Sequence, residues 1–183
     1  MFVITGATGH TGKIAAETLL AAGKKVRVVV RNADKAAGLA KLGAEVVTGD
    51  LSDRASLARA FAGASGVYLI SPPDMTTSNF LAERKPWLEA IARTAADAKV
   101  PHVVFLSSLG AEHVAGTGPI VTLHAGEEAL RAAGVPATLL RAGYFLENWA
   151  AVLPVAKKDG VLPSFLPAGF STITVATADI GRA

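Results

Sequence analysis

The residues of this sequence that are best arranged for chemistry are three glycines near its start. Gly6, Gly9 and Gly12 follow the apolar run 2–4 with the spacing G-x-x-G-x-x-G. A turn of this kind between a strand and a helix directs backbone N–H groups and a helix N-terminus toward a phosphate. Gly6 permits the tight turn, Gly9 allows close approach of a pyrophosphate, and Gly12 allows the helix to pack against the strand. The spacing predicts a bound nucleotide, and a plain strand-to-helix turn is the alternative.

The second apolar run ends in an arginine. In NAD-specific sites an acidic residue about 20 residues beyond the glycine turn binds the ribose 2′-hydroxyl. Arg31 stands at that place, without a neighbouring Asp or Glu. Its planar guanidinium can donate two hydrogen bonds to a 2′-phosphate. Arg31, with Lys35 as a further candidate, therefore favours NADP(H) over NAD(H), although an exposed arginine at a strand end is also common.

The third apolar run ends beside a candidate adenine site. Asp50 can accept a hydrogen bond from the adenine amino group, and Leu51 can pack on the adenine ring. Asp50 or Ser52 could instead cap the next helix. The two interpretations are compatible.

Candidates for the reacting end of the cofactor come later in the chain. Ser107 ends the fifth apolar run, where it would lie beside the nicotinamide or simply bond its own backbone. His124 and Glu128 share one face of the following helix, and we expect His124 to point toward the cleft. Glu127 and Arg131 are expected to form a solvated ion pair on that helix.

The elements that must position these residues alternate along the chain. Apolar, β-branched runs predict strands, and Ala- and Leu-rich stretches predict helices. This alternation is typical of an α/β fold, a doubly wound parallel sheet of the Rossmann type. Ser71, Pro72 and Pro73 follow the fourth strand at the carboxyl edge of the sheet, where ligands bind. The predicted strands are 2–5, 25–30, 45–48, 66–70, 102–106 and 137–140, and the predicted helices are 12–22, 34–42, 52–62, 78–99 and 120–133.

The pattern changes after Arg141. Residues 143–149 are aromatic and loop-like, and prolines interrupt the chain beyond them. We therefore predict an NADP-binding Rossmann domain over residues 1–141 and a partial substrate-binding lobe over residues 142–183. The lobe is either incomplete or unusually small.

Composition excludes several classes of protein. The chain has 183 residues, 51% hydrophobic and 18% charged, so it can bury a core. The net charge of +3 comes from scattered basic residues and gives no stripe for nucleic acid. No run is long enough to span a membrane, and the glycine turn interrupts the N-terminal apolar run, so we expect a cytoplasmic protein without a signal peptide. Cysteine is absent and His124 with Glu128 lacks a third ligand, so no metal is expected.

Several segments together resemble the NmrA-like group of atypical short-chain dehydrogenases/reductases: residues 5–12, 31–32, 49–51, 106–108 and 140–149. This group includes NAD(P)H:quinone oxidoreductases and NADP-sensing regulators. The resemblance implies a Rossmann-type fold, bound NADP(H) and a small carbonyl or quinone substrate. It assigns the 2′-phosphate to Arg31 and the adenine to Asp50 and Leu51. It assigns the pyrophosphate to Gly6, Thr8, Gly9, His10, Thr11 and Gly12.

The fifth helix departs from the usual short-chain dehydrogenase pattern. Typical members carry Tyr-x-x-x-Lys there, whereas residues 124–128 contain neither residue. His124, Tyr144 and Ser107 are the polar groups predicted to lie near the substrate. A quinone can accept hydride without a dedicated strong acid. We therefore expect an NADPH-dependent oxidoreductase that reduces a quinone or a related carbonyl compound, for which a homodimer is possible.

A non-catalytic, NADP(H)-sensing regulator that docks on a partner protein is the alternative function. The missing Tyr-x-x-x-Lys favours it, because that pair supplies the proton in typical members. A nucleotide-sugar epimerase or dehydratase is disfavoured, since those enzymes also depend on the tyrosine.

Overall fold

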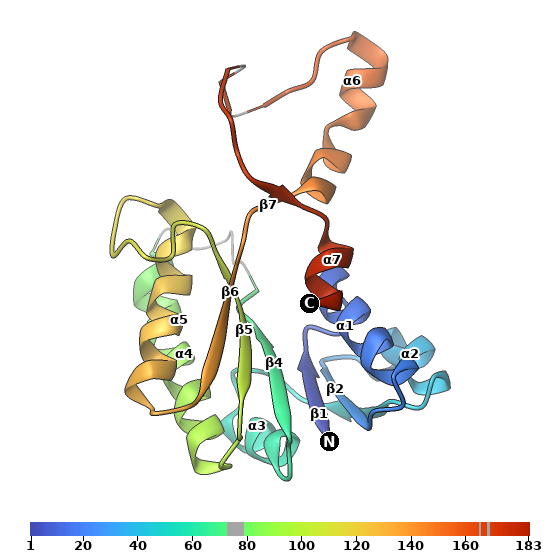
Figure 1. Ribbon diagram of the computed structural model, residues 1–183, viewed down its shortest axis with the longest axis vertical. Helices are drawn as coiled ribbons and strands as arrows, with labels where there is room; N and C mark the ends of the chain where they lie inside the picture. Colours follow the sequence, from blue (N-terminus) through green and yellow to red (C-terminus); the bar gives the residue numbers. More distant parts are fainter. Residues whose placement is uncertain (73–78, 165, 168) are drawn as a thin grey trace.

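A parallel β-sheet is the centre of the molecule (Figure 1). The computed structural model describes residues 1–72, 79–164, 166–167 and 169–183. Within these residues the main sheet has six strands in the order β3-β2-β1-β4-β5-β6, which confirms the predicted Rossmann type. The order reverses between β1 and β4, and ligands bind outside the carboxyl ends of the strands at such a point. The strands are β1 (Phe2–Thr5), β2 (Val26–Val30), β3 (Glu45–Thr48), β4 (Gly66–Ile70), β5 (Val103–Ser108) and β6 (Ala137–Ala142).

Helices cover both faces of this sheet, with α1 and α2 on one side and α3, α4 and α5 on the other (Figure 1). Neighbouring residues of one strand face opposite layers. Val103 and Phe105 join the core beneath α4 and α5, whereas Val104 and Leu106 pack toward α1. Because both faces are buried, the strands are almost entirely apolar. The helices are α1 (His10–Ala21), η1 (Ala33–Ala36), α2 (Ala37–Lys41), α3 (Arg54–Phe61), α4 (Phe80–Asp97), η2 (Gly118–Ile120) and α5 (Val121–Ala132).

The last two strands of the sheet are longer than the sequence pattern predicts. They remain paired through Ser107 opposite Arg141 and Ser108 opposite Ala142. Ser107, Ser108 and Arg141 are polar but lie within strands, because the backbone ladder continues to the carboxyl edge. Ser107 and Arg141 are thereby held on adjacent strands.

Helix starts also differ from the prediction. Neither Asp50 nor Ser52 is the N-cap of α3; the Asp53 side chain accepts a hydrogen bond from the backbone N–H of Ala55 at 3.0 Å. The predicted start of the fourth helix at Ser78, and Pro73 in the preceding loop, lie outside the described residues.

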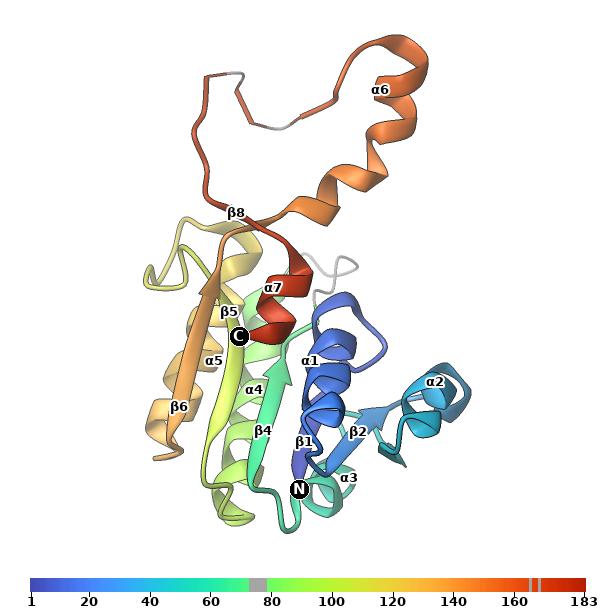
Figure 2. The same ribbon diagram turned by 45° about the vertical axis from the view of Figure 1, so that its right-hand side comes forward.

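The C-terminal residues leave the sheet and then return to its first helix. The strands β7 and β8 pair in parallel, and α6 extends beyond the carboxyl edge of the sheet, whereas α7 lies beside α1 (Figure 2). A Cβ atom on Gly181 would lie 2.5 Å from Ile14 Cβ and 2.8 Å from the carbonyl oxygen of Thr11, so glycine permits this contact. The elements are β7 (Tyr144–Phe145), η3 (Leu146–Ala151), α6 (Leu153–Asp159), β8 (Thr174–Val175) and α7 (Thr177–Arg182).

Two features are absent from the residues that the structure describes. No helix in that part of the chain is long and apolar enough to cross a bilayer. No group of three or more His, Asp or Glu side chains in that same part is arranged to hold a metal ion.

Candidate functional site

The glycine turn has the geometry that its spacing predicts. Gly6 has a φ of +63°, which favours glycine, and a Cβ atom there would lie 2.0 Å from Ile70 Cδ1. A Cβ atom on Gly12 would lie 2.5 Å from the Gly6 carbonyl oxygen, so Gly12 lets α1 start directly against the turn. Gly9 is the N-cap of α1, and no side chain caps the helix. The first N–H groups of α1 are therefore able to bind an anion.

A cleft of about 580 Å³ opens at the carboxyl edge of the sheet, beside this turn. It continues past the ends of β4 and β5 to the first residues of the C-terminal segment. The structure brings eight of the predicted site residues together around it: Gly6, Gly9, His10, Thr11, Ser71, Pro72, Ser107 and Tyr144. The other predicted residues, Thr8, Gly12, Arg31, Asp50, Leu51 and His124, are not part of its lining.

Arg31 and Asp50 lie close together at the ends of neighbouring strands. Both side chains are exposed, and Asp50 Oδ1 accepts hydrogen bonds from the backbone N–H and the hydroxyl of Ser52, at 2.8 and 2.7 Å. These bonds lower the pKa of Asp50, and the nearby positive charge of Arg31 lowers it further. Leu51 packs against the core cluster beneath α3 and α4. The sheet edge thus presents a cation and a carboxylate beyond the glycine turn.

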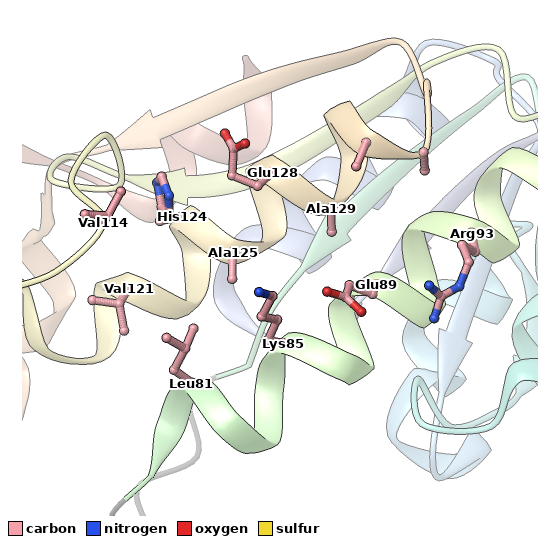
Figure 3. A pocket seen from close by; sticks show the side chains of 12 residues that line it. Leu81, Lys85, Glu89, Arg93, Val114, Val121, His124, Ala125, Glu128 and Ala129 are labelled. Carbon is pink, nitrogen blue, oxygen red and sulfur yellow. The ribbon is translucent and has the colours of Figure 1, made fainter.

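His124 does not face the cleft, and its predicted orientation is wrong. It lines a separate groove of about 560 Å³ between α4 and α5, where Figure 3 shows it beside Val121 and Ala125. Its Nδ1 lies 2.8 Å from the carbonyl oxygen of Ala111, which can only accept, so Nδ1 carries the proton in this contact. Thr122 is one of the α5 residues that line the cleft. Since successive helical residues are rotated by about 100°, His124 is turned by about 200° from Thr122 and so faces away from the cleft.

Glu127 is buried, which corrects the expectation of a solvated pair with Arg131. The exposed fraction of Glu127 is 0%, and its carboxylate accepts hydrogen bonds from Ser107 Oγ at 2.6 Å and from Arg141 Nε and Nη2 at 2.9 and 2.6 Å. Arg131 reaches the same carboxylate at 3.3 Å and also pairs with Glu128. Burial raises the pKa of Glu127, but hydrogen bonds from Arg141 and Ser107 and the arginine charges outweigh it and lower the pKa.

The sequence contained a signal for this buried carboxylate. Glu127 follows Ala125 and Gly126 on the apolar face of α5, and a Cβ atom on Gly126 would lie 2.7 Å from Phe105 Cζ. A charged residue on such a face requires a partner of opposite charge. Arg141 at the end of an otherwise apolar strand is that partner.

A second carboxylate joins the C-terminal segment to its last helix. Glu147 accepts hydrogen bonds from the Thr177 hydroxyl at 2.7 Å and from the Thr177 backbone N–H at 2.9 and 3.0 Å. The hydroxyl bond is the main cause that lowers the pKa of Glu147. Nearby, the Tyr144 ring lies edge-on to Trp149, with centroids 5.7 Å apart. Tyr144 remains 39% exposed on the wall of the cleft.

The fold and the cleft define an α/β protein of the Rossmann type with an uncapped glycine turn at its ligand edge. The chain belongs to the NmrA-like family, whose sequence model matches residues 1–181. It is 33% identical over 166 residues to quinone oxidoreductase 2 of Escherichia coli, covering 88% of this chain and 54% of that protein. It is 34% identical over 163 residues to a (4-alkanoyl-5-oxo-2,5-dihydrofuran-3-yl)methyl phosphate reductase of Streptomyces griseus, with the same coverage of 88% and 54%. The chain thus spans about half the length of these curated relatives.

Solved structures agree with this assignment. The NADPH complex of the E. coli NADPH-dependent quinone oxidoreductase matches with a TM-score of 0.85 at 31% identity, covering 99% of this chain and 62% of that one. The NADP(H) complex of Citrobacter sp. triphenylmethane reductase matches with a TM-score of 0.85 at 28% identity and the same coverage of 99% and 62%. These structural relatives were solved with NADP(H).

Proposed function

We propose that this chain binds NADP(H) and reduces a quinone or a related small carbonyl compound. The observation that carries the proposal is a single cleft that joins the uncapped N-terminus of α1 to a largely apolar wall at Ser107 and Tyr144. In this proposal residues 1–141 hold the cofactor and residues 142–183 contribute part of the substrate wall. The reductase relatives support it.

The cofactor would lie along the sheet edge. Bound NADPH supplies the hydride. Arg31 would donate to the 2′-phosphate, while Asp50 and Leu51 would contact the adenine. Ser71 and Pro72 would border the cofactor where the strand order reverses. The pyrophosphate would be held by Gly6, Thr8, Gly9, His10, Thr11 and Gly12. The turn fits an anion because Gly6 and Gly12 have no Cβ atom, so the backbone can fold tightly against the start of α1. No side chain caps that start, which leaves the first N–H groups of α1 available.

The substrate would be oriented by the walls of the cleft. Leu106, Leu109 and Leu123 offer apolar surface for a planar acceptor. Ser107 would touch the bound molecules as a hydrogen-bond acceptor, because its proton is donated to Glu127. The Tyr144 hydroxyl has no hydrogen-bond partner among the described residues, and we propose that it donates to the acceptor oxygen that gains charge. His124 is left out of this mechanism because it faces the other groove.

The test is a titration followed by an assay on the same sample. NADPH should bind more tightly than NADH, and adding a quinone should then oxidise NADPH. Tyr144→Phe should lower kcat without changing the NADPH dissociation constant. Intact NADPH binding without turnover on any member of a quinone panel would contradict the reductase proposal.

One observation favours a second function, a non-catalytic NADP(H) sensor. With His124 turned away and the Ser107 proton held by Glu127, the cleft offers few proton donors at the place where typical short-chain dehydrogenases carry Tyr-x-x-x-Lys. A sensor should distinguish NADPH from NADP⁺ in affinity and should lack quinone turnover. Equal affinities for the two cofactor forms would contradict this function.

A further inference from the structure

Glu127 is a buried ionised side chain that the proposed reaction does not use. It lies on α5 with none of its surface exposed, and it holds partners on two different strands of the sheet. Ser107 is on β5 and Arg141 is on β6, directly opposite one another in the strand register. The Glu127 carboxylate therefore connects α5 to the ends of both β5 and β6.

Arg141 extends these contacts to the loop between β5 and α5. Its Nε and Nη2 atoms bind the two Glu127 oxygens as a fork, the strong arrangement for a guanidinium and a carboxylate. Its Nη1 atom lies 3.5 Å from Glu112 Oε2, which accepts a hydrogen bond from the backbone N–H of Gly110 at 3.1 Å. The loop that follows β5 is thus connected to the same buried carboxylate.

These contacts meet at the substrate end of the cleft. Ser107, Ser108 and Leu109 form one part of its lining, and Ala142 to Phe145, which directly follow Arg141, form another. The glycine turn, between β1 and α1, lines another part of the cleft, and no hydrogen bond or ion pair of the described residues joins it to Glu127. The clamp, defined as Ser107, Glu127 and Arg141, therefore acts on one end of the cleft.

Stability alone does not account for this arrangement. A buried ion pair recovers little more than its desolvation cost, and apolar replacements are often neutral or stabilising. The ion pair can instead hold its partner groups in defined positions. An apolar cluster cannot do this, because dispersion contacts lack direction.

We propose that Glu127 is a positioning residue for the substrate end of the cleft. Acting through Ser107 and Arg141, it sets the separation between the wall that ends β5 and the wall that begins at Ala142. It also fixes the hydrogen-bonding role of the Ser107 hydroxyl. An ionised carboxylate can only accept, so Ser107 donates its proton to Glu127 and can only accept a hydrogen bond from a bound molecule. The proposal rests on the proposed reductase function for its kinetic consequence, but its structural consequence is independent of that function.

The test uses three variants of the full chain. Glu127→Gln keeps an acceptor oxygen for Ser107 but removes the charge that holds Arg141. Ser107→Ala removes one contact of the clamp and leaves Arg141 in place. Glu128→Gln is the matched control, because Glu128 is the next residue of the helix but is exposed and pairs with Arg131.

Two readouts separate positioning from a general loss of structure. Glu127→Gln should raise KM for the quinone about tenfold while the NADPH dissociation constant changes less than about twofold, since misplacing one wall affects only what that wall binds. Hydrogen exchange of the NADP⁺-bound protein should be faster at residues 103–110 and 137–145 and unchanged at residues 2–12. Ser107→Ala should show the same pattern on β5 with a smaller effect, and Glu128→Gln should match the wild type.

Unchanged exchange at both strand ends in Glu127→Gln would overturn the proposal, whatever the assay shows. Equal losses in NADPH binding and quinone KM would also overturn it. If Glu127→Gln does not fold, the test rests on Ser107→Ala. Faster hydrogen exchange at residues 103–110 in that variant would support the proposal, and unchanged exchange there would overturn it. If the wild type reduces no quinone, the reductase function fails, whereas faster exchange at the two strand ends would still support the positioning role.

Discussion

The two ends of the cleft are built in different ways. At the cofactor end, the hydrogen bonds that shape the glycine turn and the Asp50 loop join residues near each other in the sequence, such as Gly9 N–H to the Gly6 carbonyl oxygen and the Ser52 hydroxyl to Asp50. At the substrate end, the contacts span long distances along the chain. Ser107 and Glu127 are 20 residues apart, and Glu147 and Thr177 are 30 apart. Local hydrogen bonds thus shape the turn and the loop that offer groups to the cofactor, whereas long-range ion pairs and hydrogen bonds hold the walls of the substrate end.

Charge differs between the ends in the same way. Arg31 and Asp50 are exposed, so they remain available to a ligand, whereas Glu127 is buried and its hydrogen bonds are made within the protein. The cofactor end therefore exposes its charged groups to a ligand, while the substrate end uses them to hold its own walls. The two ends should therefore respond differently to substitution.

The largest effect is expected at the glycine turn. Gly12→Ala places a Cβ atom 2.5 Å from the Gly6 carbonyl oxygen, so the turn must open. We expect NADPH affinity to fall about 100-fold, equivalent to about 2.7 kcal/mol. Gly38→Ala is the control, because a Cβ atom at Gly38 meets nothing within 4 Å. Fluorescence titration of both variants measures the effect, and equal affinities would show that the turn does not hold the cofactor.

A smaller and more selective effect is expected at Arg31. Removing one charged hydrogen-bond donor from a phosphate costs about 2 kcal/mol, so Arg31→Ala should weaken NADPH binding about 30-fold. NADH lacks the 2′-phosphate and should bind as before. Lys35→Ala serves as the comparison variant. Equal losses for both cofactors would mean that Arg31 does not contact the 2′-phosphate.

The substrate end should show a pH dependence that the cofactor end lacks. The pKa of Glu127 is lowered in the folded state, so its contribution to stability is present above the usual carboxyl pKa of about 4.3 and is lost as the pH falls through the folded value. Glu127→Gln should therefore be about 2 kcal/mol less stable than the wild type at pH 7, because the hydrogen bonds to a charged acceptor are lost. Urea unfolding should show this difference shrinking in strongly acidic buffer. A difference that stays constant with pH would mean that the carboxylate charge is not the cause.

The smallest effect is expected at the join between the C-terminal segment and α7. Glu147→Gln keeps the shape of the side chain but removes the charge that accepts from Thr177, so α7 should be held less tightly. We expect a change of about threefold or less in quinone KM, as for one charge at a helix start. Limited proteolysis reports the loosening directly. Asp159→Asn is the control, since Asp159 is exposed at the end of α6 and makes no ion pair with the described residues.

Much of the fold followed from the sequence because its signals are local. The apolar runs predict every strand of the main sheet, and the spacing of Gly6 and Gly12 predicts a turn whose contacts require glycine. The predicted ends of the strands are less accurate. The strands β5 and β6 extend to Ser108 and Ala142 because Ser107 pairs with Arg141, and this pairing depends on the neighbouring strand rather than on the residues themselves. The division at residue 142 and the role of each site residue remain predictions.

Side-chain direction was the feature that sequence reasoning judged least well. His124 is predicted in the cleft, but the orientation of α5 places it in the separate groove that α4 and α5 line. Glu127 is predicted in solvent, but the same orientation directs it to Arg141 on β6. Gly126 packs closely on Phe105 in this orientation, since a Cβ atom there would lie 2.7 Å from Phe105 Cζ.

The α/β alternation, the glycine turn and a cation at the end of β2 can be predicted from the chain alone. Each of these depends on residues within one turn or one strand, where backbone propensity and periodicity are sufficient. In contrast, the link from Glu127 on α5 to β5 and β6, and the packing of α7 on α1, are seen only in the folded structure. Those contacts join residues 14 or more positions apart. Their formation depends on how whole elements pack; the pattern of α5 indicates that Glu127 needs a partner, but not that the partner is Arg141.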